Sequence, residues 1–377
     1  MADQVDILGQ GLGAARRSLR QVHRAASDLK RGVPVVLSGA EPLAILAVET
    51  ADLSGLAEFR MLGAGGETLI LAPGRAAAIA PGPVDMGAAA TALMVPAGLD
   101  ALPVFQALAD PTVEQPALPQ DPTLVTPPGA AGAALGLTKV AQLLPAVLAR
   151  PLSAHYARLL VDHALIAVAP ADIANHADHE LAVLQQLTSA TVPLSDAPET
   201  RVVAFRIHAS ATEHLAIVVG TPEAAEAPLV RIHSACYTGD VLGSMRCDCG
   251  EQLRGAIRRM SEDGSGVLLY MAQEGRGIGL VNKLRAYDLQ DRGLDTMDAN
   301  RALGWGADER RFEAGAAMLR NLGIKRVRLM TNNPDKLAAM QAHGIEVVER
   351  EAHLFAANGI NDEYLATKAS RFGHMLD

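Results

Sequence analysis

The three cysteines of the chain are the residues best suited to chemistry. Cys236, Cys247 and Cys249 all fall within residues 231–250 of a 377-residue sequence. Thiolates are soft ligands that suit zinc, and a tetrahedral zinc ion takes four donors. Because the sequence holds no fourth cysteine, three thiolates leave one position for water. The sequence therefore predicts a catalytic zinc rather than a closed structural zinc site.

The residues around the cysteines predict a local fold that brings the sulfurs together. Cys236 follows a predicted strand at residues 229–232, and a single residue, Asp248, separates the other two cysteines. A tight turn at Asp248 would aim both of their sulfurs the same way. Gly250 then begins a predicted helix, whose N-terminus favours the thiolate form of Cys249.

Other interpretations of the cysteines stay open. They could be small buried hydrophobic residues, a redox-active dithiol, or a closed zinc site completed by His233. A histidine close to cysteines is more often satisfied by ordinary hydrogen bonds than by a metal. Neighbouring phosphate-binding patterns favour the catalytic zinc over these alternatives.

Two stretches after the cysteines have the pattern of anion-binding sites. Residues 266–271 form a predicted buried strand that ends in a glycine-rich loop, residues 273–279, which a helix follows. Such a loop alone could be only a tight turn, but it contains Arg276, and a guanidinium matches phosphate oxygens with two hydrogen bonds. Residues 331–334 cap a second predicted helix, whose N-terminus and Lys336 predict another anion site.

Two charged residues follow a glycine pair further along the chain. Asp308 and Arg310 either begin a solvated helix, predicted at residues 309–322, or face a substrate. The pattern alone leaves both interpretations open.

Helices and strands alternate along the chain, which predicts an α/β fold of the mixed α+β kind. A chain of 377 residues exceeds one compact core, so we expect two domains, residues 1–195 and 196–377. The proline-rich residues 110–132 predict an extended loop. The main predicted helices and strands lie at residues 5–30, 33–37, 44–48, 68–71, 88–94, 140–149, 201–207, 214–219, 229–232, 266–271, 280–287, 309–322, 327–330, 335–341 and 345–348.

Composition narrows the class of protein. Hydrophobic residues make up 49% and charged residues 20% of the chain, which is typical of a soluble globular protein. The net charge of −9 argues against nucleic acid or a membrane surface as a partner. The apolar runs are too short to span a bilayer, and the N-terminus lacks the pattern of a signal peptide. Cysteines without a pairing framework indicate a reducing compartment, so we expect a cytoplasmic protein.

From residue 198 onward, the sequence resembles GTP cyclohydrolase II. Six motifs carry the resemblance, and their order and spacing make it highly specific. The resemblance implies the fold of that family, with a mixed sheet and flanking helices. The motifs are Arg231-Ile-His-Ser-x-Cys-x-Thr-Gly-Asp240, Arg246-Cys-Asp-Cys-Gly250, Gln273-Glu-Gly-Arg-Gly-Ile-Gly-Leu280, Asn282-Lys-x-Arg-Ala-Tyr287, Ala307-Asp-Glu-Arg310 and Leu329-Met-Thr-Asn-Asn-Pro334.

The resemblance implies a zinc-dependent enzyme that performs the first step of riboflavin biosynthesis. Such an enzyme hydrolyses GTP to 2,5-diamino-6-(5-phospho-D-ribosylamino)pyrimidin-4(3H)-one, formate and pyrophosphate. The resemblance assigns the zinc to Cys236, Cys247 and Cys249. It also implies Mg²⁺ with the GTP phosphates and a homodimer.

The resemblance assigns roles to further residues. Tyr287 corresponds to the residue that assists ring opening, and Asp308 and Arg310 correspond to the proton acceptor and the nucleophile. Because a guanidinium stays protonated, charge stabilisation of the transferring phosphoryl group is the easier role for Arg310. The residues implied to bind GTP are Arg231, Ile232, His233, Ser234, Ala235, Gln252, Glu274, Gly275, Arg276, Thr296, Thr331 and Lys336.

Residues 1–195 are similar in layout to 3,4-dihydroxy-2-butanone-4-phosphate synthase. The similarity rests on Lys30-Arg-Gly-Val-Pro-Val-Val-Leu37 and on its position ahead of the second domain. The acidic magnesium-binding run of that family should follow, but Ser38-Gly-Ala-Glu-Pro42 stands in its place. One Glu beside a Pro does not supply convergent carboxylates. We therefore expect a degenerate, non-catalytic domain.

Two positions depart from the GTP cyclohydrolase II pattern. Ala235 stands where the family commonly has Glu, and Ala272 stands where a basic residue is common. We still expect full activity, because the zinc ligands and the catalytic residues are present. The alternatives are a paralogue that only opens the purine ring of GTP or of another nucleotide, and a non-catalytic nucleotide-binding regulator.

Overall fold

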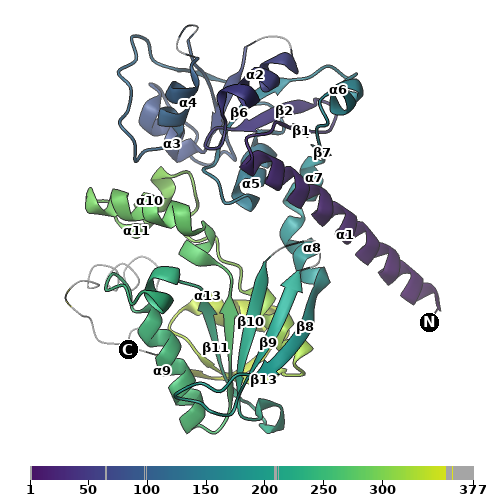
Figure 1. Cartoon of the computed structure of the whole chain (residues 1–377), viewed down its shortest axis with the longest axis vertical. Coiled ribbons are helices and arrows are strands. Elements are labelled where there is room, and N and C mark those ends of the chain that lie inside the picture. Colours follow the sequence, from purple (N-terminus) through teal and green to yellow (C-terminus); the bar gives the residue numbers. More distant parts are fainter. Residues whose placement is uncertain are drawn as a thin grey trace. The chain divides into compact units, whose positions relative to one another are not determined.

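The computed structural model describes residues 2–63, 66–96, 98, 100–207, 210, 212–353 and 359. The chain divides into two compact units (Figure 1). The first unit comprises Met1–His179 and Val281–Glu309, and the second comprises Glu180–Leu280 and Arg310–Asp377. The segment Val281–Glu309 therefore folds with the first half of the chain, although residues 180–280 separate the two in sequence.

The first unit is built on a mixed sheet that has seven strands among the described residues. Their order is β5-β4-β3-β6-β2-β1-β7. The β1–β7 pair is parallel, and the other neighbours are antiparallel. The strands are β1 (Val35–Leu37), β2 (Leu43–Ala47), β3 (Thr68–Leu71), β4 (Thr91–Met94), β5 (Thr123–Val125), β6 (Ala146–Pro151) and β7 (Ala167–Val168).

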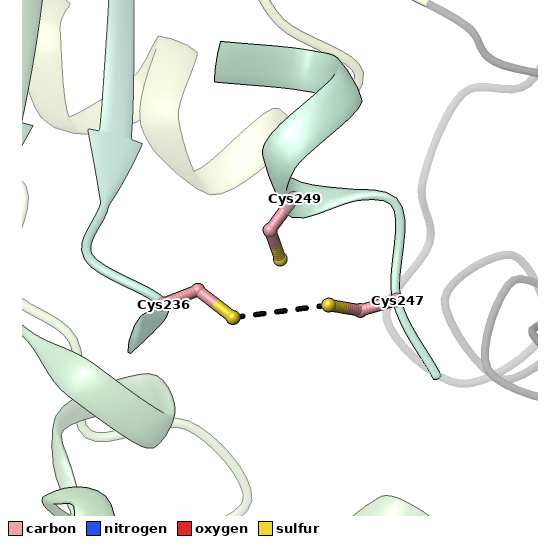
Figure 2. A group of neighbouring side chains, drawn as sticks. All are labelled: Cys236, Cys247 and Cys249. Atoms are coloured by element: carbon pink, nitrogen blue, oxygen red, sulfur yellow. Dashed lines mark hydrogen bonds between the residues drawn. The ribbon is translucent and has the colours of Figure 1, made fainter. Parts of the chain in front are cut away.

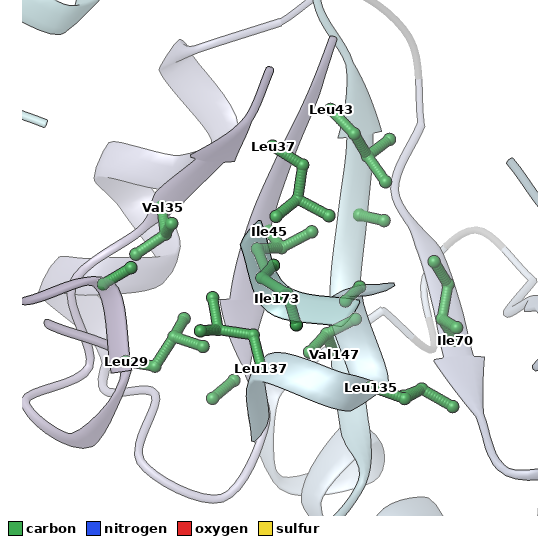
Figure 3. Packing of buried hydrophobic residues seen from close by; sticks show 14 of the residues in the cluster. Leu29, Val35, Leu37, Leu43, Ile45, Ile70, Leu135, Leu137, Val147 and Ile173 are labelled. Atoms are coloured by element: carbon green, nitrogen blue, oxygen red, sulfur yellow. The ribbon is translucent and has the colours of Figure 1, made fainter. Parts of the chain in front are cut away.

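Both faces of this sheet are buried. Successive side chains of a strand point to opposite faces, so Leu43 and Ile45 of β2 enter one core cluster while Ala44 and Leu46 enter the other. The first cluster contains side chains of α1 (Ala2–Lys30), α5 (Ala131–Val140) and α7 (Pro170–Ala174), and Figure 3 shows Leu43 and Ile45 in it. The second contains side chains of α2 (Leu53–Met61), α3 (Pro73–Ile79) and α4 (Leu102–Ala109). Burial on both faces explains why β2 is an unbroken apolar run.

The predicted long N-terminal helix is confirmed as α1, which begins a few residues earlier than expected. The predicted extended loop at residues 110–132 is wrong in part, because Thr123–Val125 pairs with β4 as β5. The helices are α1 (Ala2–Lys30), α2 (Leu53–Met61), α3 (Pro73–Ile79), α4 (Leu102–Ala109), α5 (Ala131–Val140), α6 (Ala157–Asp162), α7 (Pro170–Ala174), α8 (His176–Val183, which runs into the second unit), α10 (Leu280–Asp291) and α11 (Thr296–Ala302).

The second unit is built on another mixed sheet, again with seven strands among the described residues. Their order is β14-β13-β11-β12-β10-β9-β8. The neighbours from β14 to β12 are parallel, and those from β12 to β8 are antiparallel. The strands are β8 (Leu184–Thr191), β9 (Thr200–Ile207), β10 (Glu213–Val219), β11 (Leu229–Ser234), β12 (Gly266–Met271), β13 (Arg326–Met330) and β14 (Glu346–Glu351).

Helices and short turns connect these strands, and the two mixed sheets confirm the predicted α/β class. The predicted helix at residues 309–322 begins only at Glu313. Several elements lie outside the predicted ones: α2, α3, α4, α6, α7, α8, α11, β5, β7, β8 and η1 (Pro222–Ala224). The connecting elements of this unit are α9 (Cys249–Glu262), α12 (Glu313–Asn321), α13 (Pro334–Ala342), the π-helical turn η2 (Tyr237–Val241) and the 3₁₀ turns η1 and η3 (Glu274–Gly277).

Among the described residues, the structure contains no helix that is both long enough and apolar enough to cross a membrane.

Candidate active site

Three parallel strands of the second unit end at one edge of its sheet. β11 lies between β13 and β12, so the carboxyl ends of all three are neighbours. Cys236 follows β11, the glycine-rich loop at residues 273–279 follows β12, and Thr331 follows β13. Ligands of α/β folds bind at the carboxyl ends of parallel strands. The edge is therefore the expected place for a site.

The cysteines meet at this edge from three short elements. Cys236 follows β11, Cys247 lies in the turn before α9, and Cys249 begins α9 (Figure 2). The three Sγ atoms lie within 4.8 Å of one another, and those of Cys236 and Cys247 are 3.8 Å apart. A tetrahedral zinc ion with Zn–S bonds of about 2.3 Å separates its sulfurs by about 3.8 Å. The cluster therefore has the spacing that zinc requires.

Gly239 has no side chain, and the sulfurs of the cluster occupy the space where one would lie. It lies in η2, and its N–H donates to the Sγ of Cys236 at 3.3 Å. A β-carbon on Gly239 would lie 2.8 Å from the Sγ of Cys247 and 3.0 Å from that of Cys236. Close-packed interiors do not tolerate such contacts. Glycine is needed here because a side chain would enter the cluster.

Asp240 holds three groups around Cys236. Its carboxylate accepts hydrogen bonds from the N–H of Cys236 at 2.9 Å and from the hydroxyl of Tyr270 at 2.9 Å. It also pairs with Nε2 of His233 at 3.1 Å, and the side chains of Asp240 and His233 are each 3% exposed. Hydrogen bonds behind a metal ligand fix its orientation. Nε2 of His233 is thus directed at Asp240 rather than at the sulfurs.

The crowding of the sulfurs changes the pKa of the thiols. The hydrogen bond with Cys236, with burial, raises the pKa of Cys247 to about 11. A hydrogen bond with Cys236 also raises the pKa of Cys249 well above its ordinary value. Such thiols keep their protons at neutral pH unless a cation stabilises the thiolates, as a divalent metal does. Three convergent thiols are the type of donor that zinc prefers, so the cluster fits a metal site.

Phe312 brings two cations of the predicted GTP-binding and catalytic set together. The guanidinium carbon of Arg310 lies 5.2 Å from the centroid of the Phe312 ring, and Nζ of Lys336 lies 5.4 Å from it. The face of an aromatic ring attracts cations. Lys336 also donates to the carbonyl of Ile232 in β11 at 2.8 Å. These contacts place two positive charges close to the end of β11.

Arg231 adds a third cation, within β11 itself. Its side chain is buried and donates to Gln252 of α9. Burial lowers the pKa of Arg231 to about 10, so the guanidinium stays charged at neutral pH. Gln252 in turn donates to Asp248, next to two of the cysteines, at 2.5 Å.

The glycine-rich loop after β12 folds as η3 with two residues in the left-handed region. Gly275 has φ of 62° and Arg276 has φ of 61°. A side chain rarely adopts this conformation, and such residues cluster at functional sites. Glu274 accepts the N–H of Tyr237 at 2.5 Å, which ties the loop to the segment that follows Cys236.

Comparison with known proteins identifies the family. Residues 185–352 match the family described as GTP cyclohydrolase II. GTP cyclohydrolase-2 of Azospirillum brasilense is 46% identical over 365 residues, which cover 95% of this chain and 94% of that protein. The chain belongs to the GTP cyclohydrolase II family. GTP cyclohydrolase-2 of Pasteurella multocida is 50% identical over 197 residues, which cover 52% of this chain and 90% of that protein.

A solved two-domain structure is also similar to this GTP cyclohydrolase II family member. It is RibBX of A. baumannii, described as a 3,4-dihydroxy-2-butanone 4-phosphate synthase. The likeness covers 89% of this chain and 99% of that chain, with 17% identity and a TM-score of 0.34. A likeness this weak does not bear on the fold.

Three residues expected to act in a GTP cyclohydrolase II belong to the first unit. Tyr287 lies in α10, where Nζ of Lys283 is 5.7 Å from its ring centroid. Thr296 is the first residue of α11, and its hydroxyl accepts from Gln290 at 3.4 Å. Asp308 lies after α11, near the end of the segment Val281–Glu309.

The other expected residues of the GTP cyclohydrolase II site belong to the second unit. Ser234 ends β11, Ala235 follows it and donates to the carbonyl of Met271 at 2.8 Å, and Thr331 accepts the N–H of Asn333 at 3.1 Å. The complete set in this unit is Cys236, Cys247, Cys249, Arg231, Ile232, His233, Ser234, Ala235, Gln252, Glu274, Gly275, Arg276, Arg310, Thr331 and Lys336.

Three residues that hold the site of this GTP cyclohydrolase II family member were not predicted. Asp240 lies inside the first family motif, and groups that hydrogen-bond to a metal ligand commonly fix its orientation. Tyr270 and Phe312 looked like ordinary apolar positions of a strand and a helix. Only their partners, Asp240 for the hydroxyl and two cations for the ring, reveal their roles.

Proposed function

We propose that this protein is an active, zinc-dependent GTP cyclohydrolase II. It hydrolyses GTP to 2,5-diamino-6-(5-phospho-D-ribosylamino)pyrimidin-4(3H)-one, formate and pyrophosphate, the first step of riboflavin biosynthesis. The observation that carries this proposal is the three-sulfur cluster at the edge where a glycine-rich loop and several cations also lie. Family membership supports the reaction.

Cys236, Cys247 and Cys249 would hold the zinc ion. When bound, zinc supplies a Lewis acid that makes hydroxide available near neutral pH. Gly239 keeps the cluster open, and Asp240 fixes the backbone of Cys236. No fourth cysteine is present in the sequence to close the site.

The chain's own residues would orient the nucleotide and move protons. A carboxylate such as Glu274 can accept from both N1–H and the 2-amino group of guanine. The hydroxyl of Tyr287 would donate and accept a proton during ring opening. Arg310 would stabilise the charge of the transferring phosphoryl group, with Asp308 orienting the guanidinium.

The triphosphate would lie against cations and helix N-termini. Arg231, Arg276 and Lys336 would supply the charge, and the N-terminus of α13 would supply backbone N–H groups. The remaining GTP-binding residues are Ile232, His233, Ser234, Ala235, Gln252, Gly275, Thr296 and Thr331. Mg²⁺ would accompany the phosphates, as it does for most enzymes that bind nucleoside triphosphates. We place the enzyme in the cytoplasm as a homodimer.

We assign residues 196–377 to catalysis of this reaction and residues 1–195 to a degenerate domain like 3,4-dihydroxy-2-butanone-4-phosphate synthase. The alternatives are an enzyme that stops after ring opening and a regulator that only binds the nucleotide. The presence of Tyr287, Asp308 and Arg310 favours the complete reaction over both.

Incubation of the purified protein with GTP tests the proposal, with formate and pyrophosphate followed separately. The complete enzyme releases both products, an incomplete enzyme releases formate alone or neither, and a regulator releases neither. Cys247→Ser should lose bound zinc and both products while the fold is retained. Wild-type protein that binds no zinc, or that leaves GTP intact, contradicts the proposal.

Arg310→Ala separates the two halves of the reaction. We expect this variant to bind the nucleotide but to fail in pyrophosphate release, because the charge on the phosphoryl group loses its partner. Nucleotide binding is measured by calorimetry and pyrophosphate by a coupled assay. Normal pyrophosphate release would remove the role that we assign to Arg310.

A further inference from the structure

The segment Val281–Glu309 matches the GTP cyclohydrolase II family in sequence but folds with the first unit. By sequence it lies inside residues 185–352, which match the GTP cyclohydrolase II family. By structure it is part of the first unit. The segment carries Tyr287 and Asp308, two residues to which the proposed function gives catalytic roles. What holds the segment therefore bears on catalysis.

Arg285 attaches the start of the segment to the first unit. Its Nε donates to Asp110 at 2.9 Å, and its Nη1 donates to Glu49 at 2.9 Å. The three side chains are only 19%, 14% and 15% exposed, in the order Arg285, Asp110, Glu49. Glu49 also accepts the N–H of Leu144 at 2.6 Å, so this carboxylate is itself fixed by the backbone. A guanidinium held by two carboxylates in this way is set in both position and direction.

Two further side chains strengthen the attachment of α10. Asn282, which is fully buried, donates to the carbonyl of Gln142 at 3.0 Å. Arg292 donates to the carbonyl of Thr112 at 2.7 Å. Asn282 lies one turn before Arg285, and Arg292 directly follows the last residue of α10, Asp291. The helix that carries Tyr287 is thus attached near both of its ends.

The end of the segment is attached as well. Lys139 of α5 pairs with Glu309 at 2.5 Å, and its Nζ lies 5.6 Å from the centroid of the Trp305 ring. The helix α11 packs on α3, where a β-carbon on Gly74 would lie 3.3 Å from the carbonyl oxygen of Arg301. In the sequence, Asp308 lies between Trp305 and Glu309, and both of these residues contact Lys139.

The partners of the segment lie outside the part of the chain that matches the family. Glu49, Asp110, Lys139 and Gln142 all precede residue 185. Short helices such as α10 and α11 are marginal without packing. Removal of one partner from a part-buried charge network is costly because it leaves the other charge uncompensated. The first unit therefore decides how well the segment is ordered.

We propose that the first unit positions the catalytic segment 281–309 through a clamp formed by Glu49, Asp110 and Arg285. The clamp holds α10, and so Tyr287, in the orientation that the reaction needs. Arg285 is a positioning residue that acts through the helix and touches no substrate. This gives the degenerate domain a task in GTP hydrolysis. The catalytic part of the inference rests on the proposed function, whereas the clamp itself can be tested without turnover.

Arg285→Ala in the full-length protein tests the clamp. Hydrogen exchange of peptides from residues 281–309 should become about tenfold faster, while peptides from residues 229–250 and the zinc content stay unchanged. The kcat for formate release should fall about 10- to 100-fold, because a small misplacement of a catalytic group is this costly. The KM for GTP should change less than about threefold, and Arg285→Lys should restore part of the kcat.

Matched variants make the result decisive. Arg158→Ala removes an exposed arginine of the same unit, 88% exposed and paired with Asp162, and should change neither exchange nor kcat. Asp110→Asn replaces Arg285→Ala if that variant does not fold, with the same expected direction. Unchanged exchange, or unchanged kcat in an enzyme that turns over GTP, overturns the inference alone. Absence of turnover by the wild type overturns the proposed function, and the exchange data then still decide whether the clamp exists.

Discussion

Asp240 and Phe312 show how single residues that bind no metal and no substrate set the candidate site. Asp240 accepts hydrogen bonds from Cys236 and Tyr270 and pairs with His233. Phe312 presents one ring to Arg310 and Lys336. In both cases one side chain fixes groups from two or more elements. The geometry of the site therefore depends on these residues as much as on the ligands.

Asp240→Asn should weaken zinc binding about 10- to 100-fold. In the wild type, Oδ2 accepts from both Cys236 and Tyr270 while Oδ1 faces Nε2 of His233. The amide can keep the first two hydrogen bonds only by directing its NH₂ group at His233, and it has lost the negative charge. Competition with a chromophoric chelator measures the affinity. Asp196→Asn is the control, because that carboxylate is 42% exposed and pairs only at 3.5 Å with Arg258. Equal zinc affinity in the two variants would contradict the role of Asp240.

Phe312→Leu should raise the KM for GTP about threefold to tenfold and change kcat less. Leucine fills apolar space but has no aromatic face, and each cation–π contact is worth about 0.5–2 kcal/mol. Steady-state kinetics measure the effect. The control is Phe205→Leu in the core of β9, which is fully buried and should lower the free energy of unfolding without changing KM. A normal KM in Phe312→Leu would show that the ring does not position the cations.

At the scale of elements, a side chain of β10 forms a hydrogen bond with the residue that follows β12, in addition to the pairing of the two strands. The N–H of Ala272 donates to Nδ1 of His214 at 3.0 Å, just before the glycine-rich loop begins. His214 is 4% exposed, and burial lowers its pKa to about 4. The ring must be neutral at Nδ1 to accept this bond. The position of the loop thus depends on a neutral histidine.

The unfolding free energy should fall as the pH falls from about 6.5 to 4. In this range the unfolded chain binds a proton at His214 and the folded chain does not, so acid favours unfolding. The loss from His214 should be about 2 kcal/mol at pH 5, relative to neutral pH. His214→Asn keeps an acceptor without the titration and should reduce this loss. Urea unfolding at pH 7 and pH 5 measures it, and an identical loss in the variant would exclude His214 as the source.

At the scale of the whole molecule, the residues predicted to act in the proposed reaction are divided between the two compact units. The second unit holds the cysteines and the cations, and the first holds Tyr287, Thr296 and Asp308. The first unit has a full core of its own on both faces of its sheet. The segment 281–309 is therefore held on a unit that has its own packed core.

The first unit should not form a four-carbon phosphate from ribulose 5-phosphate. After β1, residues 38–42 supply one carboxylate, that of Glu41, and its side chain is exposed. Convergent carboxylates are needed to bind Mg²⁺ tightly. Incubation with ribulose 5-phosphate and Mg²⁺ should yield no formate, whereas GTP yields formate in the same preparation. Formate from the sugar phosphate would show that the domain is catalytic.

Local sequence was sufficient for much of the fold and for the centre of the site. Three cysteines around one strand end and one helix start predicted the cluster, because each sulfur is placed by its immediate neighbours. The helix expected from residue 309 was wrong at its start, since the carboxylate of Glu309 accepts the N–H of Gly306 at 2.7 Å and pairs with Lys139 instead. The helix α11 was missed, although Asp295 caps it through the N–H of Asp298 at 2.9 Å.

Only the tertiary structure decided which parts of the chain fold together. Arg285 contacts Glu49 across 236 residues of sequence and Asp110 across 175. Periodicity and turn signals report on neighbours within a few turns, so they say nothing about such pairs. The sequence determined the cysteine cluster, which a strand end, a turn and a helix start bring together. The assignment of residues 281–309 to the first unit follows from burial and charge pairing, which exist only once the chain is folded.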